Sequence, residues 1–315
     1  MSAASALSVA WDEHSLDLPL HRFGEGTTRC MIVAGVHGRE HSGIQVSYAL
    51  AERLAEIPGI QGSIEILPVA NPESFTADTR ENPVDGKNLG EIFSPSDPLR
   101  QGVTQTEAIA GTILSRLDGV SHLLDLHSAG EGRYLPHALF LQEQDAPTAA
   151  ASGLPFALLR RRTREGKEVG MLSQAALQRR IPALALELGG GITTYPEDID
   201  QGIRSVLSLL TFWRYLPQEY RLNPTPPDRV LLRDDRKFIR AWEEGAFYPM
   251  CALGEIVGKG QRIGTWISLE HLEAVPVVAL ESGLLIYIRT RCRSHSGDTL
   301  AMLLPEVPVQ GMKKE

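Results

Sequence analysis

Short apolar runs alternate with amphipathic segments through the first two thirds of the chain. Four apolar runs predict buried strands: 31–36, 63–70, 122–127 and 182–188. Apolar residues at helical spacing predict three helices, which end near residue 57 and span 108–117 and 203–215. The alternation of strand and helix predicts an α/β fold, with a mostly parallel or mixed sheet and helices on both faces.

The two ends of the chain have a different pattern. Up to about residue 28 we expect only short strands and turns. The proline-rich stretch 223–228 is typical of a linker, and short alternating runs separated by glycines follow it, the first at 230–232. We therefore expect one domain over residues 1–222 and a small all-β domain over residues 223–315.

The composition narrows the class of protein. The 315 residues carry a formal net charge of -8, which argues against a nucleic-acid-binding surface. The three cysteines include no CxxC pair, so we expect neither a disulfide framework nor a cysteine zinc site. The chain opens without a signal-peptide pattern, and no apolar stretch reaches the roughly 18 residues of a membrane span. We expect a cytoplasmic protein without membrane contact.

Two polar residues follow the first buried strand in a tight turn. His37 and Glu40 lie in the stretch Gly-Val-His-Gly-Arg-Glu at 35–40, between that strand and an amphipathic helix. The carboxyl ends of strands are where open α/β sheets bind ligands. An imidazole and a carboxylate three residues apart can face one cation, and zinc takes nitrogen and oxygen ligands. The sequence therefore predicts part of a zinc site.

The third ligand is expected at His127, because it also ends a buried strand. A parallel sheet would bring the two strand ends together. For a lone histidine, a core residue bonded to the backbone would be the favoured interpretation, but the His37–Glu40 turn at the equivalent place favours a metal ligand at His127. His41 is a second candidate for the third ligand. His41 lacks the HExxH pattern, so we expect it to support a ligand or to lie on the surface.

Three further charged groups are candidates for the chemistry. Glu187 ends an apolar strand before three glycines, which suits a general base, although it could also face outward from an edge strand. Arg80 lies in a long polar loop between 71 and about 102, and could stabilise an oxyanion or simply be solvated. The basic run at 160–164 is interpreted as a solvated helix face.

This ordered set resembles the succinylglutamate desuccinylase/aspartoacylase family of the zinc carboxypeptidase superfamily. The resemblance rests on residues 35–40, Asn71-Pro72, Arg80, Asp85-Gly86, Asp125-Leu126-His127-Ser128 and Glu187-Leu188-Gly189, and on the glycine-rich stretch 254–264. It covers nearly the whole chain. It implies a zinc carboxypeptidase-like α/β domain followed by a barrel-sandwich β domain, and a zinc amidohydrolase that deacylates an N-acylated amino acid or a related small amide.

The resemblance also implies a role for each candidate residue. His37, Glu40 and His127 would hold one Zn2+ ion per chain. Glu187 would act first as general base and then as general acid, and Arg80 would polarise the scissile carbonyl.

One position departs from the family. Where the family has an arginine that grips a substrate carboxylate, this chain has Glu91, three residues after Asn88. We take Asn88 and Glu91 as substrate-binding residues, and the negative charge predicts a substrate with a cationic or neutral group at that end. The alternative is that Glu91 turns outward and another arginine grips the substrate.

Three hypotheses about function stay open. The first is a deacylase acting on a small-molecule N-acyl substrate. The others are a metallo-carboxypeptidase-like peptidase and a non-catalytic zinc-binding regulatory protein on the same scaffold. We expect no nucleic-acid or membrane partner, and the chain could form a homo-oligomer.

Overall fold

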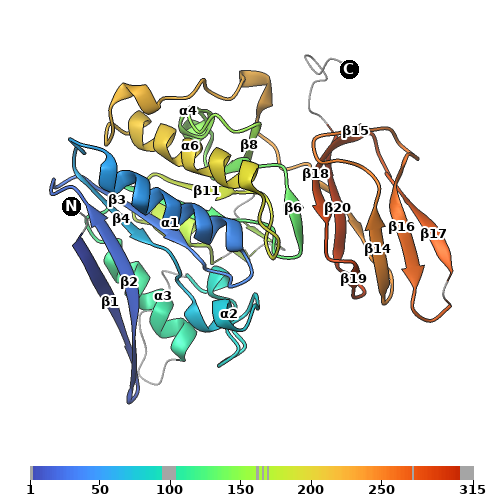
Figure 1. Ribbon diagram of the computed structural model, residues 1–315, viewed down its shortest axis with the longest axis horizontal. Helices are drawn as coiled ribbons and strands as arrows, with labels where there is room; N and C mark the ends of the chain where they lie inside the picture. Colours follow the sequence, from blue (N-terminus) through green and yellow to red (C-terminus); the bar gives the residue numbers. More distant parts are fainter. Residues whose placement is uncertain are drawn as a thin grey trace.

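The computed structural model describes residues 3–93, 104–160, 163–164, 167–168, 170–271 and 273–305. Within them, a mixed nine-stranded sheet forms the centre of the first domain (Figure 1). Its strands lie in the order β1 (Ala3–Trp11), β2 (His14–Phe23), β4 (Ser63–Leu67), β3 (Arg29–Ala34), β5 (His122–His127), β11 (Ala183–Glu187), β7 (His137–Phe140), β8 (Phe156–Leu159) and β12 (Val230–Leu231). The four central strands β4, β3, β5 and β11 are parallel, so their carboxyl ends meet at one edge of the sheet.

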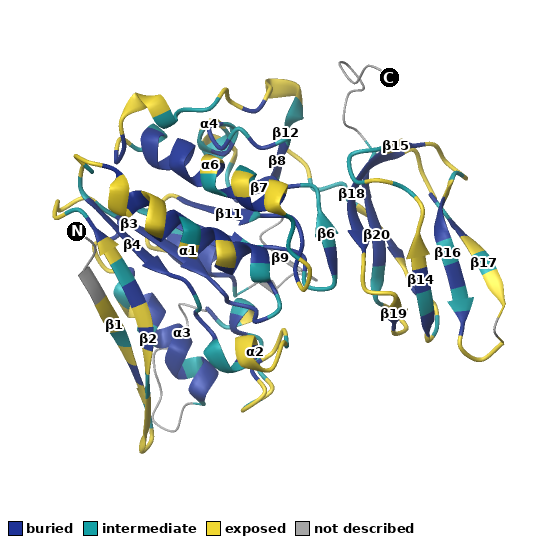
Figure 2. Cartoon of the chain, in the orientation of Figure 1, coloured by how far each residue is buried: buried dark blue, intermediate teal, exposed yellow. Residues whose placement is uncertain are grey.

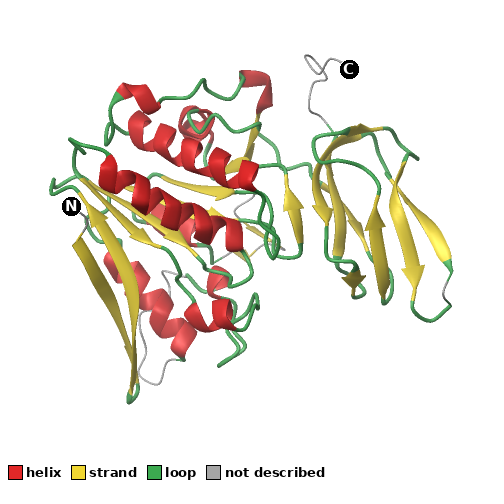
Figure 3. Cartoon of the chain, in the orientation of Figure 1, coloured by secondary structure: helices red, strands yellow, loops and turns green. Residues whose placement is uncertain are grey.

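Helices cover both faces of this sheet, and its central strands are buried between them, whereas β1 and β2 are partly exposed (Figures 2 and 3). One face packs against α1 (His41–Glu56), α4 (Ala146–Ala150) and α6 (Pro196–Phe212). The other face packs against α3 (Gln105–Arg116) and α5 (Leu172–Gln178). Successive residues of β3 alternate between the two cores, because side chains of a strand point to opposite faces. The shorter helices are α2 (Pro72–Thr76), η1 (Leu89–Glu91), η2 (Glu143–Asp145), η3 (Gln218–Tyr220) and η4 (Pro227–Arg229).

The carboxy-terminal part is built from two antiparallel sheets around a core that contains Phe247 and Trp266. One sheet has the order β13 (Lys237–Arg240), β20 (Thr299–Leu304), β18 (Gly283–Arg289) and β15 (Ile256–Val257). The other has the order β17 (Ala274–Val278), β16 (Arg262–Ser268), β14 (Gly245–Pro249) and β19 (Arg293–Ser294). Strand β6 (Gly132–Tyr134) comes from the first part of the chain but pairs with β18.

The two parts of the chain are joined by apolar packing in addition to the pairing of β6 with β18. A buried cluster combines Leu139 and Ala185 of the large sheet with Ile286 and Met302 of the carboxy-terminal sheet. Burial of this apolar surface fixes the β domain against the face of the large sheet that carries Glu187. No helix among the described residues is long and apolar enough to cross a membrane.

The expected α/β fold with a carboxy-terminal β domain is confirmed, and β5 spans the predicted 122–127. The expectation of short amino-terminal strands is wrong, since β1 and β2 form a long hairpin that widens the large sheet. Helix α6 begins at Pro196 rather than near residue 203, because a proline and two acidic residues suit its first turn.

Two further expectations need correction. The run 160–164 does not lie on a helix: Arg160 follows β8, and β9 (Thr163–Arg164) pairs with β10 (Lys167–Glu168), while residues 161 and 162 lie outside the described part of the chain. The sequence places the stretch 230–232 in the β domain, but β12 pairs with β8 in the large sheet. The boundary between residues 222 and 223 stays a prediction.

One carboxylate ties the two parts together. Glu131 accepts hydrogen bonds from Arg39 in the turn after β3 (2.6 Å) and from Arg289 and Arg291 (3.0 Å for Arg291) at the end of β18. Arg289 is almost fully buried, so it depends on this partner and on Asp298.

We expect Glu131→Ala to lower the free energy of unfolding by about 3 kcal/mol, because three guanidinium groups lose a shared carboxylate and the buried Arg289 keeps only Asp298 as an acidic partner among the described residues. Denaturant unfolding measures the change. The control is Glu197→Ala, which removes an exposed partner of Arg133 and should cost clearly less stability, because exposed ion pairs contribute little. Equal effects of the two substitutions would contradict the role assigned to Glu131.

Acid should destabilise the protein partly through His122. Burial lowers the pKa of His122 from 6.5 to about 4, and its ring stacks on Trp213 with Nδ1 3.0 Å from the Tyr215 hydroxyl. Above pH 6.5 the imidazole is neutral in both states. Below it, only the unfolded chain takes up the proton, so stability is lost as the pH falls toward about 4. His122→Phe should lose less stability than the wild type between pH 7 and pH 5, and an unchanged loss would contradict this account.

Candidate metal centre and active site

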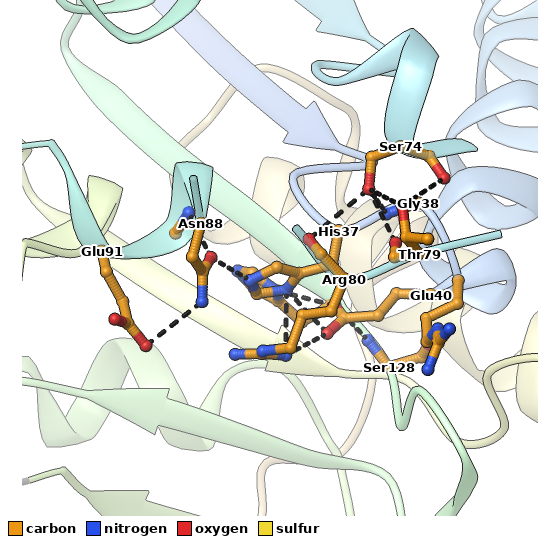
Figure 4. Close-up of polar contacts among 12 residues, drawn as sticks. His37, Gly38, Glu40, Ser74, Thr79, Arg80, Asn88, Glu91 and Ser128 are labelled. Atoms are coloured by element: carbon orange, nitrogen blue, oxygen red, sulfur yellow. Dashed lines mark hydrogen bonds and ion pairs between the residues drawn. The ribbon is translucent and has the colours of Figure 1, made fainter. Parts of the chain in front are cut away.

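The turn after β3 is shaped by close contact with α2 (Figure 4). Gly35 has a φ of 65°, in the left-handed region that favours glycine. A Cβ on Gly38 would lie 2.0 Å from the carbonyl of Ser74, so only glycine allows this approach. The Gly38 amide donates to Ser74 Oγ at 3.0 Å. This contact fixes the turn that carries His37 and Glu40.

The structure brings three of the predicted residues together. Glu40 Oε1 lies 2.7 Å from His37 Nδ1, and Glu40 Oε2 lies 2.8 Å from His127 Nδ1. One ligand atom from each residue lies within 4.8 Å of the others, and this group could hold a metal ion. His37, Glu40 and His127 are called the metal-binding group below for that capacity. His37 and Glu40 are buried, and His127 is partly exposed. The adjacency of β3 and β5 in the parallel sheet produces this arrangement.

The chemistry of these donors fits zinc. Two imidazole nitrogens and a carboxylate converge in one buried place. Nitrogen and oxygen atoms this close to each other need a proton or a cation between them. Burial raises the pKa of Glu40, but His37 and His127 outweigh burial and hold that pKa well below its usual range. Burial lowers the pKa of His127, but Asp125 and Glu40 outweigh it and hold that pKa well above its usual range. Positive charge next to the Glu40 carboxylate is therefore favourable in this site.

Glu187 ends β11, directly beside this group. In the sheet it is paired with His127 on one side and with His137 on the other. Its Oε2 atom is buried and has no hydrogen-bond partner among the described residues. Burial raises the pKa of Glu187, and this effect outweighs the opposing attraction of His127. A carboxylate with a free oxygen next to a metal-binding group can accept and return a proton.

Arg80 reaches the same place from the segment after α2. Its Nη1 atom lies 3.4 Å from His37 Nδ1 and 3.4 Å from Glu40 Oε1. Its side chain is 47% exposed, so the guanidinium faces both the metal-binding group and solvent. It is available to a ligand that enters from outside.

Asn88 and Glu91 lie at the other side of His37, at the two ends of η1. Asn88 Oδ1 is 2.9 Å from His37 Nε2, and Asn88 Nδ2 donates to Glu91 Oε1 at 3.1 Å (Figure 4). Glu91 is exposed. Asn88 therefore contacts both Glu91 and the metal-binding group.

Two contacts at the site are not predicted by the sequence. Asp125 Oδ1 lies 3.0 Å from His127 Nε2, and the Ser128 amide donates to Glu40 Oε2 at 3.2 Å. The spacing of Asp125 and His127 is a usable signal, because residues i and i+2 of a strand share a face. His41 lies outside the metal-binding group: its Nε2 atom is 3.5 Å from Asp78 Oδ1, and its ring lies against Phe75.

Comparison with known proteins gives a consistent result. The model of the succinylglutamate desuccinylase/aspartoacylase catalytic domain matches residues 26–213. An N-alpha-acetyl-L-2,4-diaminobutyric acid deacetylase from Halomonas elongata is 29% identical over 314 residues, covering 96% of this chain and 89% of the relative.

Two solved structures show the same fold along nearly the whole chain. One is a succinylglutamate desuccinylase/aspartoacylase from Rhodobacter sphaeroides, with a TM-score of 0.79, 23% identity, and coverage of 97% of this chain and 96% of that one. The other is the product-bound ectoine utilization protein EutE from Ruegeria pomeroyi, with a TM-score of 0.81, 24% identity, and coverage of 96% and 94%. The chain belongs to the succinylglutamate desuccinylase/aspartoacylase family.

Proposed function

We propose that this protein is a zinc-dependent amidohydrolase that removes the acyl group from an N-acylated amino acid. The observation that carries the proposal is the group formed by His37, Glu40 and His127, with the unpartnered oxygen of Glu187 beside it. Membership in the family and the deacetylase from Halomonas elongata support the same reaction class.

The residues suggest how the reaction is divided among them. A zinc ion held by His37, Glu40 and His127 would polarise the scissile carbonyl and lower the pKa of a water molecule. Arg80 donates to the carbonyl oxygen from the exposed side and stabilises the negative charge that develops there. Its half-exposed guanidinium can do this while it stays beside Glu40.

Glu187 moves the proton. Its free Oε2 atom accepts a proton from the attacking water and returns it to the leaving nitrogen, so one carboxylate acts as base and then as acid. The β domain packs on the sheet face that carries Glu187, which limits the access of bulk water to this proton.

The substrate we propose is an N-acetylated diamino acid. Glu91 places a carboxylate against Asn88, which in turn contacts His37, so an acidic substrate would be repelled at this end of the site and an ammonium group attracted. The named substrate of the relative from Halomonas elongata carries a free amine. Asn88 and Glu91 are the proposed contacts to this end of the substrate.

Other expectations remain predictions: the peptidase and the non-catalytic hypotheses, the cytoplasmic location, the absence of nucleic-acid and membrane partners, and a homo-oligomeric state. Activity on peptides would favour the peptidase. A lack of any activity in the zinc-loaded protein would favour the non-catalytic hypothesis.

Glu187→Gln should lower kcat by on the order of 10²–10⁴-fold, because the amide cannot take the proton of the attacking water. Metal content should be unchanged, since Glu187 is not among the three ligands. Amine release from N-acetyl substrates and metal analysis measure the two effects. The matched control is Glu219→Gln at an exposed position, which should keep full activity. Retained activity in Glu187→Gln would remove Glu187 from the mechanism.

The wild type should prefer basic substrates over acidic ones by at least about tenfold in kcat/KM, the effect of one charged hydrogen bond. A panel of N-acetyl and N-succinyl compounds with acidic, neutral and basic amine portions measures this preference. Glu91→Arg should reverse it. An unchanged preference in Glu91→Arg would mean that Glu91 does not contact the substrate.

A further inference from the structure

Glu91 makes a contact that substrate binding does not require. Its Oε1 atom accepts from Asn88 Nδ2 at 3.1 Å, and Asn88 Oδ1 lies 2.9 Å from His37 Nε2. Glu91, Asn88 and His37 therefore form a continuous chain of hydrogen bonds that ends on a predicted metal ligand (Figure 4).

The chemistry of the neighbours determines which way the Asn88 amide points. Asn88 Oδ1 also accepts from the Gly90 amide at 2.9 Å. If the amide were turned over, its NH2 group would face the Gly90 N–H, and its oxygen would face the Glu91 carboxylate. Both contacts would be repulsive, because each would pair two donors or two acceptors. The carboxylate of Glu91 thus holds the Asn88 oxygen toward His37.

The orientation of Asn88 in turn determines the tautomer of His37. An oxygen 2.9 Å from Nε2 accepts a hydrogen bond, so Nε2 carries a proton and the lone pair of Nδ1 is the one that a metal ion can take. Glu40 Oε1 lies 2.7 Å from Nδ1, and a carboxylate oxygen this close to a ring nitrogen needs a proton or a cation between them. The hydrogen bond that Nε2 donates to Asn88 therefore makes Nδ1 the ligand atom.

The η1 segment is held rigidly enough to keep this chain in place. Leu89 and Phe93 are fully buried in the core on either side of Glu91, and the Phe93 amide donates to the Gly170 carbonyl at 2.9 Å. A Cβ on Gly90 would lie 2.7 Å from His37 Nε2, so the absence of a side chain lets η1 approach the imidazole.

We propose that Glu91 is a positioning residue for the metal ligand His37, acting through the amide of Asn88. The proposal rests on the metal-dependent activity proposed above. It separates two properties of Glu91: its acceptor atom orients Asn88, whereas its negative charge selects the substrate. A glutamine at position 91 keeps an acceptor and loses the charge, and a methionine loses both.

Metal affinity tests the proposal without any substrate. The full-length protein is stripped with a chelator and titrated with Zn2+ and Co2+, and the dissociation constants are measured by competition with a chelating dye. We expect Asn88→Leu and Glu91→Met to weaken binding by on the order of 10-fold or more, as for other residues that orient a metal ligand. Glu91→Gln should bind within about twofold of the wild type.

The control is Glu81→Met, at an exposed position of the same segment outside the chain of hydrogen bonds, and it should bind metal like the wild type. Side-chain ¹⁵N spectra of the histidines in the Zn2+-loaded protein give a second readout. They should show His37 protonated at Nε2 in the wild type and in Glu91→Gln. In metal-stripped Asn88→Leu, they should show a mixture of tautomers.

The two proposals fail in different ways. If the wild type binds metal and Glu91→Met binds it equally well, the positioning role of Glu91 is wrong while the proposed enzyme stands. If Glu91→Gln loses as much affinity as Glu91→Met, charge rather than the acceptor atom acts on the metal site, and the positioning role is again wrong. If the wild type binds no divalent metal, the metal-dependent function fails, and the positioning role fails with it.

Discussion

The site depends on one buried carboxylate placed between two imidazoles. In the sequence, α1, β4, α2, η1, α3 and most of β5 separate Glu40 from His127, and yet the Glu40 oxygens lie within hydrogen-bond distance of both His37 and His127. A buried charge without such partners would be strongly unfavourable. The parallel pairing of β3 with β5 supplies one partner, and the glycine turn that packs on Ser74 supplies the other. The contact of Glu40 with both histidines therefore requires both this order of strands and this tight turn.

The carboxy-terminal domain takes part in this constraint. Arg39 lies in the turn with His37 and Glu40, and its guanidinium binds Glu131, which also binds Arg289 and Arg291 of the β domain. The Cβ of any larger residue at Gly130 would lie 3.2 Å from the Arg39 side chain, so the β5–β6 segment follows that turn closely. Displacement of the β domain would break the ion pairs of Glu131 with Arg289 and Arg291, and Glu131 is the partner that holds Arg39 in the turn. The domain thus supports the metal-binding turn as well as covering the sheet.

The sequence was most informative where a single local rule decides the structure. Buried parallel strands are nearly continuous apolar runs, so β5 could be placed exactly at its ends, and the polar residues His37, His127 and Glu187 could be placed at one edge. The amino-terminal hairpin and β12 were misjudged, because pairing with a distant strand decides their structure. The amide of Asn88 shows the same limit at the site: its orientation is set by Glu91, Gly90 and His37 together, and no local pattern encodes it.

The energetics of Glu187 favour an enzyme over a non-catalytic scaffold. Its Oε2 atom is buried without a partner among the described residues, and burial raises its pKa, so the ionised side chain destabilises the fold. A glutamine or an apolar residue would relieve that cost in a protein that only bound metal, because the metal-binding group is complete without Glu187. A free, buried oxygen beside a metal-binding group is useful when a proton has to be taken up and returned at that point. Local destabilisation at a site that could otherwise be relaxed is the signature expected of catalysis.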